Sequence, residues 1–149
     1  MPGISTDLKK ALAQWIFKQT AFITPPTTLF YSLHSADPGD VGTNELDVLS
    51  PGYARAELDP DPDTATNINY TNTNNIGDTL LINNASVITF PKSASLWNNG
   101  NPIPFWALWS QSTGGLFIMA GTISGDPVVV GTSGVILSVP VEHLIITIS

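Results

Sequence analysis

Turn-forming residues divide this chain into short apolar runs, and that spacing limits the folds open to it. Twelve Gly and twelve Pro are spread over 149 residues. The second half holds six apolar runs separated by turns that contain Gly or Pro: 86–90, 105–109, 116–123, 128–130, 135–139 and 143–148. Runs of this length are typical of strands. With two further strands near Leu29 and Tyr53, the sequence predicts an all-β fold, an antiparallel β-sandwich (jelly-roll or immunoglobulin-like) of about seven or eight strands.

Residues 6–19 are the exception, because their apolar side chains recur at helical spacing. The stripe has five members at i, i+3, i+4, i+7 and i+8: Leu8, Ala11, Leu12, Trp15 and Ile16. This pattern predicts an N-terminal amphipathic helix, which Thr6 or Ser5 can cap. We expect the stripe to cover an open end or face of the protein's own sheets, and docking onto a partner is the alternative interpretation.

Composition excludes several classes of protein. The length suits a single domain over residues 1–149, and without cysteine neither a disulfide nor a thiolate metal site holds it together. The net charge of −7 argues against nucleic acid as a partner. No apolar run approaches membrane-spanning length, and the N-terminus lacks a signal-peptide pattern. We therefore expect a soluble protein with no membrane contact, not secreted by the general route.

The polar segment 59–75 predicts a long acidic loop insert. Asp59, Asp61 and Asp63 repeat at the spacing of hard-cation ligands, but Thr64 stands where a calcium loop needs Gly and Tyr70 where it needs Glu. We therefore expect no metal and no cofactor.

The stretch 29–55 joins an alternating strand, 29–34, to a long polar turn. The segment 36–40 and the triplet 50–52 combine Pro and Gly in ways that favour chain reversal. Arg55 is the only Lys or Arg between Lys18 and Lys92, whereas nine carboxylates lie between Asp37 and Asp78. This setting predicts a bidentate carboxylate partner for Arg55 within the 37–47 loop, with Asp37 and Glu45 as candidates.

Catalytic motifs do not emerge from the sequence. His34 and His143 have no nucleophile motif around them, and no Ser lies in a strand-turn-helix elbow. The sequence therefore predicts a protein that is not an enzyme and has no catalytic residues. Trp97, Trp106 and Trp109 cluster closely; we expect core positions, with a carbohydrate platform or an interface as alternatives. The possible interface residues are Leu8, Leu12, Trp15, Trp97, Trp106 and Trp109.

Several blocks of the sequence occur together in one family. They are Leu33-His34-Ser35-Ala36-Asp37-Pro38-Gly39, Gly42-Thr43-Asn44-Glu45 and Gly52-Tyr53-Ala54-Arg55, followed by Ile88-Thr89-Phe90-Pro91, 105–108, 113–115 and 121–123. Over residues 28–148 the chain resembles short structural proteins encoded by tailed bacteriophages and prophages, commonly labelled tail-fibre-like. It departs from their pattern at Ser110, at His143 and in the 59–75 insert.

The resemblance implies a virion component assembled in the host cytoplasm. We expect a capsid cement or decoration protein, with a tail-fibre or baseplate component and a carbohydrate-binding module as alternatives. The implied partners are the major capsid protein or tail proteins. Apolar residues on both faces of the strands at 103–109 and 116–119 predict a homo-oligomer, and the resemblance suggests a trimer.

Overall fold

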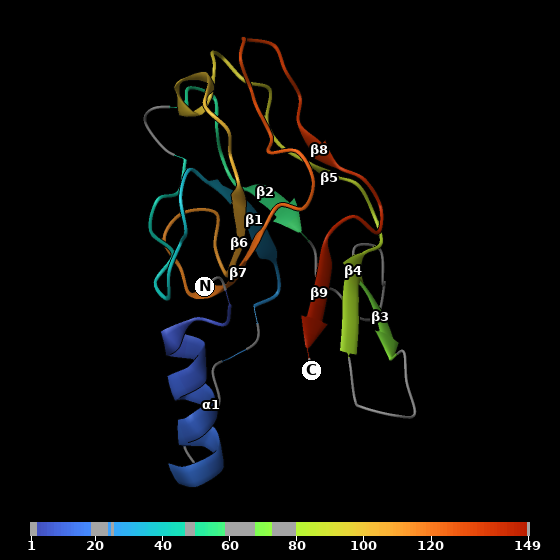
Figure 1. The fold of residues 1–149 in the computed structure, drawn as a ribbon. Helices are drawn as coiled ribbons and strands as arrows, with labels where there is room; N and C mark the ends of the chain where they lie inside the picture. Colours follow the sequence, from blue (N-terminus) through green and yellow to red (C-terminus); the bar gives the residue numbers. More distant parts are fainter. Residues whose placement is uncertain are drawn as a thin grey trace.

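A four-stranded antiparallel sheet forms the centre of the protein. The computed structural model describes residues 3–18, 24, 26–46, 50–58, 68–72 and 80–148. The central sheet has the order β2-β1-β6-β7 and is built from β1 (Leu29–His34), β2 (Ala56–Leu58), β6 (Phe105–Trp109) and β7 (Phe117–Thr122). β6 and β7 form the hairpin that the glycine turn predicts, with an irregular register between Leu108 and Trp109. Two strands distant in sequence, β1 and β6, therefore pair in the middle of the fold (Figure 1).

Two smaller antiparallel sheets lie beside the central one. One has the order β3-β4-β9, from β3 (Ile68–Asn72), β4 (Leu80–Asn84) and β9 (Ile145–Ile148); the other pairs β5 (Ile88–Thr89) with β8 (Ser138–Val139). A short 3-10 helix, η1 (Asn98–Gly100), precedes β6. Figure 1 places the three-stranded sheet to one side of the central sheet and the β5–β8 ribbon above it.

The sequence-based strand assignment needs three corrections. β3 lies inside the segment predicted as a loop; residues 59–67 and 73–75 of that segment lie outside the described residues. β4 was not predicted, and it pairs with both β3 and β9. Val128 forms only an isolated bridge with Ile103 and no strand. The third strand of the β3-β4-β9 sheet, β9, comes from the far end of the chain, and short runs carry little periodicity from which to predict strands.

The main core lies between one face of the central sheet and the segments that follow β4. An aromatic group is at its centre: Tyr31 stacks on Trp106 with ring centroids 5.6 Å apart, and Phe90 contacts both Tyr31 and Trp97. Trp97 is completely buried, and its indole N–H donates to the Pro51 carbonyl at 3.1 Å. The all-β prediction with one N-terminal helix is confirmed.

Helix α1 spans Thr6–Lys18. The prediction is 6–19, and its last residue, Gln19, lies outside the described residues. Ser5 caps it, because its Oγ accepts a hydrogen bond from the Leu8 backbone N–H at 3.1 Å. The expected burial of the apolar stripe is wrong, because no α1 residue is buried. The helix projects away from the central sheet (Figure 1). A bilayer-spanning helix is not found among the described residues.

Candidate functional site: the Arg55 network

The loop from Ser35 to Leu46, here called the 35–46 loop, connects β1 to the segment leading into β2. Its turn begins where the sequence predicts: Gly39 N–H donates to Asp37 Oδ1 at 2.9 Å, and the backbone N–H groups of Gly42 and Thr43 donate to the Pro38 carbonyl. The loop then returns along β1, with Leu46 N–H donating to the Leu33 carbonyl at 3.0 Å. The return brings Glu45 beside the end of β1.

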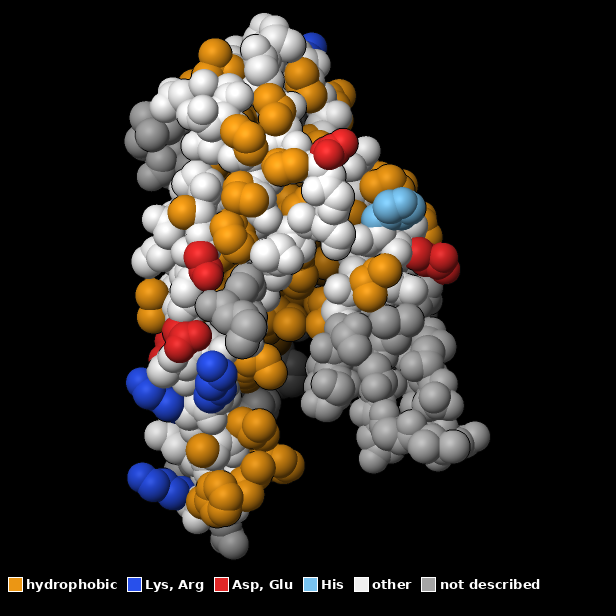
Figure 2. All heavy atoms as spheres, in the orientation of Figure 1, with side chains coloured by type: hydrophobic (Ala, Val, Ile, Leu, Met, Phe, Trp, Pro, Cys, Tyr) orange, Lys and Arg blue, Asp and Glu red, His pale blue; other side chains and the backbone are white. Residues whose placement is uncertain are grey.

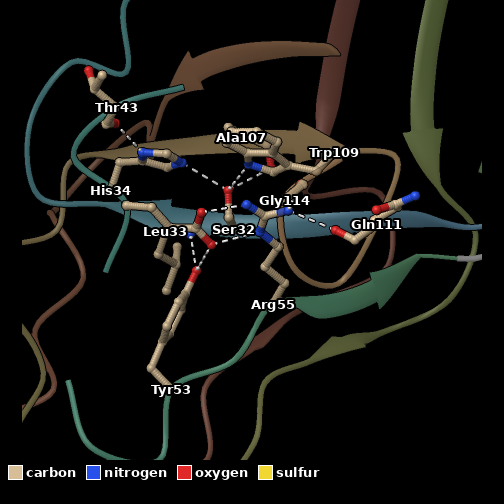
Figure 3. Close-up of polar contacts among 11 residues, drawn as sticks. Ser32, Leu33, His34, Thr43, Tyr53, Arg55, Ala107, Trp109, Gln111 and Gly114 are labelled. Carbon is tan, nitrogen blue, oxygen red and sulfur yellow. Dashed lines mark hydrogen bonds and ion pairs between the residues drawn. The ribbon is translucent and has the colours of Figure 1, made fainter. Parts of the chain in front are cut away.

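Arg55 joins this loop to the turn between β6 and β7. Its Nε and Nη2 donate to the two carboxylate oxygens of Glu45 at 2.7 and 2.6 Å, in the bidentate geometry predicted for it. Its Nη1 donates to the carbonyls of Gln111 and Gly114 at 2.7 and 2.8 Å (Figure 3). The Arg55 side chain is only 6% exposed. One guanidinium therefore binds two segments that are far apart in the sequence.

Asp37, the other predicted candidate, has a different role. Its carboxylate receives the Gly39 N–H, and this hydrogen bond holds the pKa of Asp37 below its ordinary value. The choice between the two carboxylates follows from the loop path, because Glu45 returns to β1 whereas Asp37 lies in the turn.

Trp109 forms the floor of the network. The Arg55 Cζ lies 3.9 Å from the Trp109 ring centroid, a cation–π contact with a largely buried cation. On the same ring lies Gly42, with φ +75°; a Cβ there would come within 2.4 Å of Trp109. Trp109 also packs against Phe117, with ring centroids 5.1 Å apart. The 35–46 loop thus covers part of the second apolar face of β6 and β7, for which the sequence suggested a partner.

Ser32 and His34 make a pair that resembles a nucleophile and its base. Thr43 O only accepts, so His34 Nδ1–H donates to it at 2.7 Å, which leaves Nε2 to accept from the Ser32 hydroxyl at 2.9 Å. Trp109 Nε1–H donates to Ser32 Oγ at 2.9 Å (Figure 3). Both side chains are completely buried, with 0% exposure. A substrate cannot reach them in this structure, so the pair fastens the 35–46 loop to the sheet.

Tyr53 completes the inner side of the network. Its hydroxyl accepts the Leu33 backbone N–H at 3.0 Å and donates to Glu45 Oε1 at 3.3 Å. Burial, with the Glu45 charge adding to it, raises the pKa of Tyr53. The phenol therefore stays protonated and keeps its hydrogen bond to the carboxylate.

The remaining predicted interface residues separate into two groups. Trp97, Trp106 and Trp109 are core residues with 0%, 8% and 7% exposure, which confirms the expected core positions and speaks against the alternatives of an interface or a carbohydrate platform. Leu12 and Trp15 are exposed on α1, and Leu8 is half-buried. The expected absence of a metal site at Asp59, Asp61 and Asp63 concerns residues outside the described part, and the described residues contain no group of three potential metal ligands.

Sequence reasoning missed an open apolar cleft of about 490 Å³ between the central sheet and the β8–β9 segment. Its lining includes Tyr31, Leu33, Trp106, Ile123, Leu137 and Leu144, with Glu142 and His143 beside them. These residues come from four separate stretches, so no local motif could have indicated the cleft.

Comparison with known proteins assigns the chain to a family. The family model described as Podophage GP4 fiber I protein gp80 matches residues 3–147. The chain belongs to this family. Membership of the gp80 family supports a bacteriophage virion structural protein, as the resemblance implied. A search of curated proteins finds no match.

Proposed function

We propose that this chain is a component of a fibre on a tailed-phage particle. The observation that carries the proposal is the family match, which extends over nearly the whole chain and whose description names a fibre protein. Fibre rather than capsid decoration is therefore our first choice, which reverses the order expected from the sequence alone.

The polar network is better suited to holding a structure than to binding a substrate. The Arg55 guanidinium donates four hydrogen bonds to protein acceptors, and the Ser32–His34 pair has no access to solvent. A non-enzymatic role agrees with both features. The proposed partners are other virion proteins and further copies of this chain, and the exposed apolar side chains of α1 support protein–protein assembly. A trimer is our proposal for the number of copies.

The location in the particle is tested by immunogold labelling of intact virions with antibody against this chain, together with its copy number from quantitative mass spectrometry. We expect label at the tail and a low copy number relative to the major capsid protein. Label over the whole capsid, at a copy number comparable to that of the capsid protein, would assign a decoration role instead. Absence from purified particles would overturn any virion role.

A further inference from the structure

Helix α1 exposes a large apolar surface. Leu12, Trp15, Ile16 and Phe17 are 46%, 54%, 53% and 82% exposed. The N-terminal end of the helix is attached to the central sheet and the 35–46 loop, where Ser5 N–H donates to the Ile118 carbonyl at 2.8 Å and Lys9 Nζ lies 3.8 Å from Asp40 Oδ1. Figure 2 shows hydrophobic side chains gathered along the projecting helix. An isolated helix of 13 residues is only marginally stable in water. We therefore expect another protein surface to pack against these apolar side chains.

The charges of the chain identify the kind of surface that would attract this helix. The α1 segment holds three of the five cationic residues, Lys9, Lys10 and Lys18, and one acid, Asp7, for a net charge of +2. The rest of the chain holds the other two cations and eleven acids, for a net charge of −9. The rest of a second copy of this chain therefore carries a net charge opposite to that of the helix.

The cleft between the central sheet and the β8–β9 segment has the chemistry to receive an apolar helix face. Its lining is mostly apolar, and the carboxylate on its lining belongs to Glu142. Figure 2 shows hydrophobic side chains in the hollow above the helix, on the same side of the molecule as the apolar residues of the helix. One chain thus exposes both a basic amphipathic helix and an apolar cleft with one carboxylate, Glu142, on its lining.

We propose that α1 of one copy docks in the cleft of a neighbouring copy. The apolar residues around Ile16 enter the cleft, while Lys10 and Lys18, which lie on the other side of the helix, are attracted by the net negative charge of the neighbouring copy. Helix-to-helix packing between copies is less favoured by net charge, because each α1 carries +2, whereas the cleft belongs to the part of the chain that carries −9. This contact deepens the oligomer part of the proposed function and rests on it.

The absence of cysteine from the chain makes the contact directly testable. One epitope-tagged copy carries Ile16→Cys, a co-expressed untagged copy carries Ser138→Cys on the cleft lining, and a short thiol-to-thiol cross-linker is added to the purified protein. Ser112→Cys replaces Ser138→Cys in the matched control; it is also an exposed serine, but it lies in the turn between β6 and β7. Circular dichroism checks that each variant is folded.

We expect a tagged–untagged covalent dimer with Ser138→Cys and none with Ser112→Cys. Efficient cross-linking of Ile16→Cys to itself would mean that the helices pack on one another, and this would overturn the proposal. Equal cross-linking of both serine positions would overturn it as non-specific. An intrachain cross-link in the double variant Ile16→Cys/Ser138→Cys, without dimer, would mean that the helix folds into its own cleft and would also overturn it.

Charge reversal is the second test and leaves the apolar surfaces intact. Lys10→Glu/Lys18→Glu should weaken self-association at least tenfold, and adding Glu142→Lys should restore part of it. Unchanged association in the first variant would contradict the charge argument. Light scattering of the unmodified chain tests the proposed oligomer separately from the proposed contact between α1 and the cleft. A monomer at micromolar concentration would overturn the oligomer itself. An oligomer without the Ile16–Ser138 cross-link would overturn only the contact between helix and cleft.

Discussion

The Arg55 side chain donates four hydrogen bonds, to acceptors on three residues from two separate segments of the chain. Its guanidinium is almost fully buried, binds Glu45 at two points and binds two carbonyls of the turn between β6 and β7. A lysine at this position has one nitrogen and cannot reproduce the planar set of donors. Glu45 keeps 21% exposure, so water screens it only in part when Arg55 is removed.

Arg55→Ala should lower the free energy of unfolding by about 3 kcal/mol, because the largely buried Glu45 carboxylate loses its charged partner and retains the Tyr53 hydroxyl as a neutral donor. Chemical denaturation measures the change. Lys92→Ala, which removes an exposed cation, is the matched control and should stay within about 0.5 kcal/mol of the unmodified protein. In a double-mutant cycle, Arg55→Ala with Glu45→Ala should cost less than the sum of the single changes; simple additivity would show that the pair contributes no coupling.

Because His34 is buried, we expect the stability of the protein to depend on pH. Burial lowers its pKa from 6.5, although the Thr43 carbonyl and Glu45 act in the opposite direction. Below 6.5 the unfolded chain therefore binds a proton that the folded protein does not, and the free energy of unfolding falls as pH falls. From about pH 7.5 to about pH 5.5 we expect a loss of at most about 1.4 kcal/mol per pH unit.

The His34 effect is isolated by comparing the pH slopes of variants. Thermal or denaturant unfolding of His34→Asn should show a flatter slope over this range, whatever its absolute stability. His143→Gln, which replaces an exposed imidazole bonded to the Val141 carbonyl, is the control for loss of a histidine outside the Arg55 network. The same slope in all three proteins would rule out His34 as the origin.

The 35–46 loop acts as a structural element although it contains no helix or strand of its own. Two hydrogen bonds attach it to β1: the Thr43 carbonyl accepts from His34 Nδ1–H, and the Leu46 backbone N–H donates to the Leu33 carbonyl. Gly42 lies against the Trp109 ring. The loop also reaches α1, since the Asp40 carbonyl accepts the Thr6 backbone N–H at 3.2 Å. The loop therefore connects the sheet, the Arg55 network and the base of the helix.

Two glycines of this loop allow the cost of backbone strain to be measured separately from the cost of overpacking. Gly39 and Gly42 both have positive φ, +61° and +75°, but a Cβ at Gly39 meets nothing within 4 Å whereas one at Gly42 overlaps Trp109. Gly39→Ala should cost about 1 kcal/mol of stability from backbone strain, and Gly42→Ala about 2 kcal/mol more from overpacking. Denaturant unfolding measures both, and equal losses would mean that the loop does not pack on Trp109.

At the scale of the whole molecule, charge and apolar surface are distributed unevenly. The helix is basic and exposes apolar side chains, while the remainder of the chain is strongly acidic and exposes an apolar cleft. An attraction between opposite net charges on different copies is screened by salt, whereas a purely apolar contact is not weakened by it.

Self-association should therefore weaken as salt rises from about 0.1 M to about 1 M, which shortens the Debye length from ~10 Å to ~3 Å. Analytical ultracentrifugation gives the dissociation constant at each salt concentration. Lys10→Glu/Lys18→Glu should associate weakly at both concentrations and serves as the control. Association of the unmodified chain that is independent of salt, or strengthened by it, would leave apolar burial as the sole driving force.

Local chemistry in the sequence determined the helix, most strands of the central sheet and the turns around Pro38 and Gly52. Helical and strand periodicity, capping and φ preferences act between neighbouring residues, so they can be recognised without knowing the fold. The prediction that Arg55 binds a loop carboxylate is confirmed for a related reason. The chain has few cations and many acids, so a single guanidinium within an acidic stretch has several nearby carboxylates as possible partners.

Tertiary structure decided what depends on residues far apart in the chain. The loop path selected Glu45 over Asp37, and the pairing of β1 with β6 placed Trp109 beneath Arg55 and buried a serine and a histidine together. β4 joined a sheet because β3 and β9 supply its hydrogen-bonding partners. The spacing of apolar residues in α1 predicted an apolar surface on the helix. Only the tertiary structure showed that the protein's own sheets leave this surface exposed, because burial depends on which other segments pack against it.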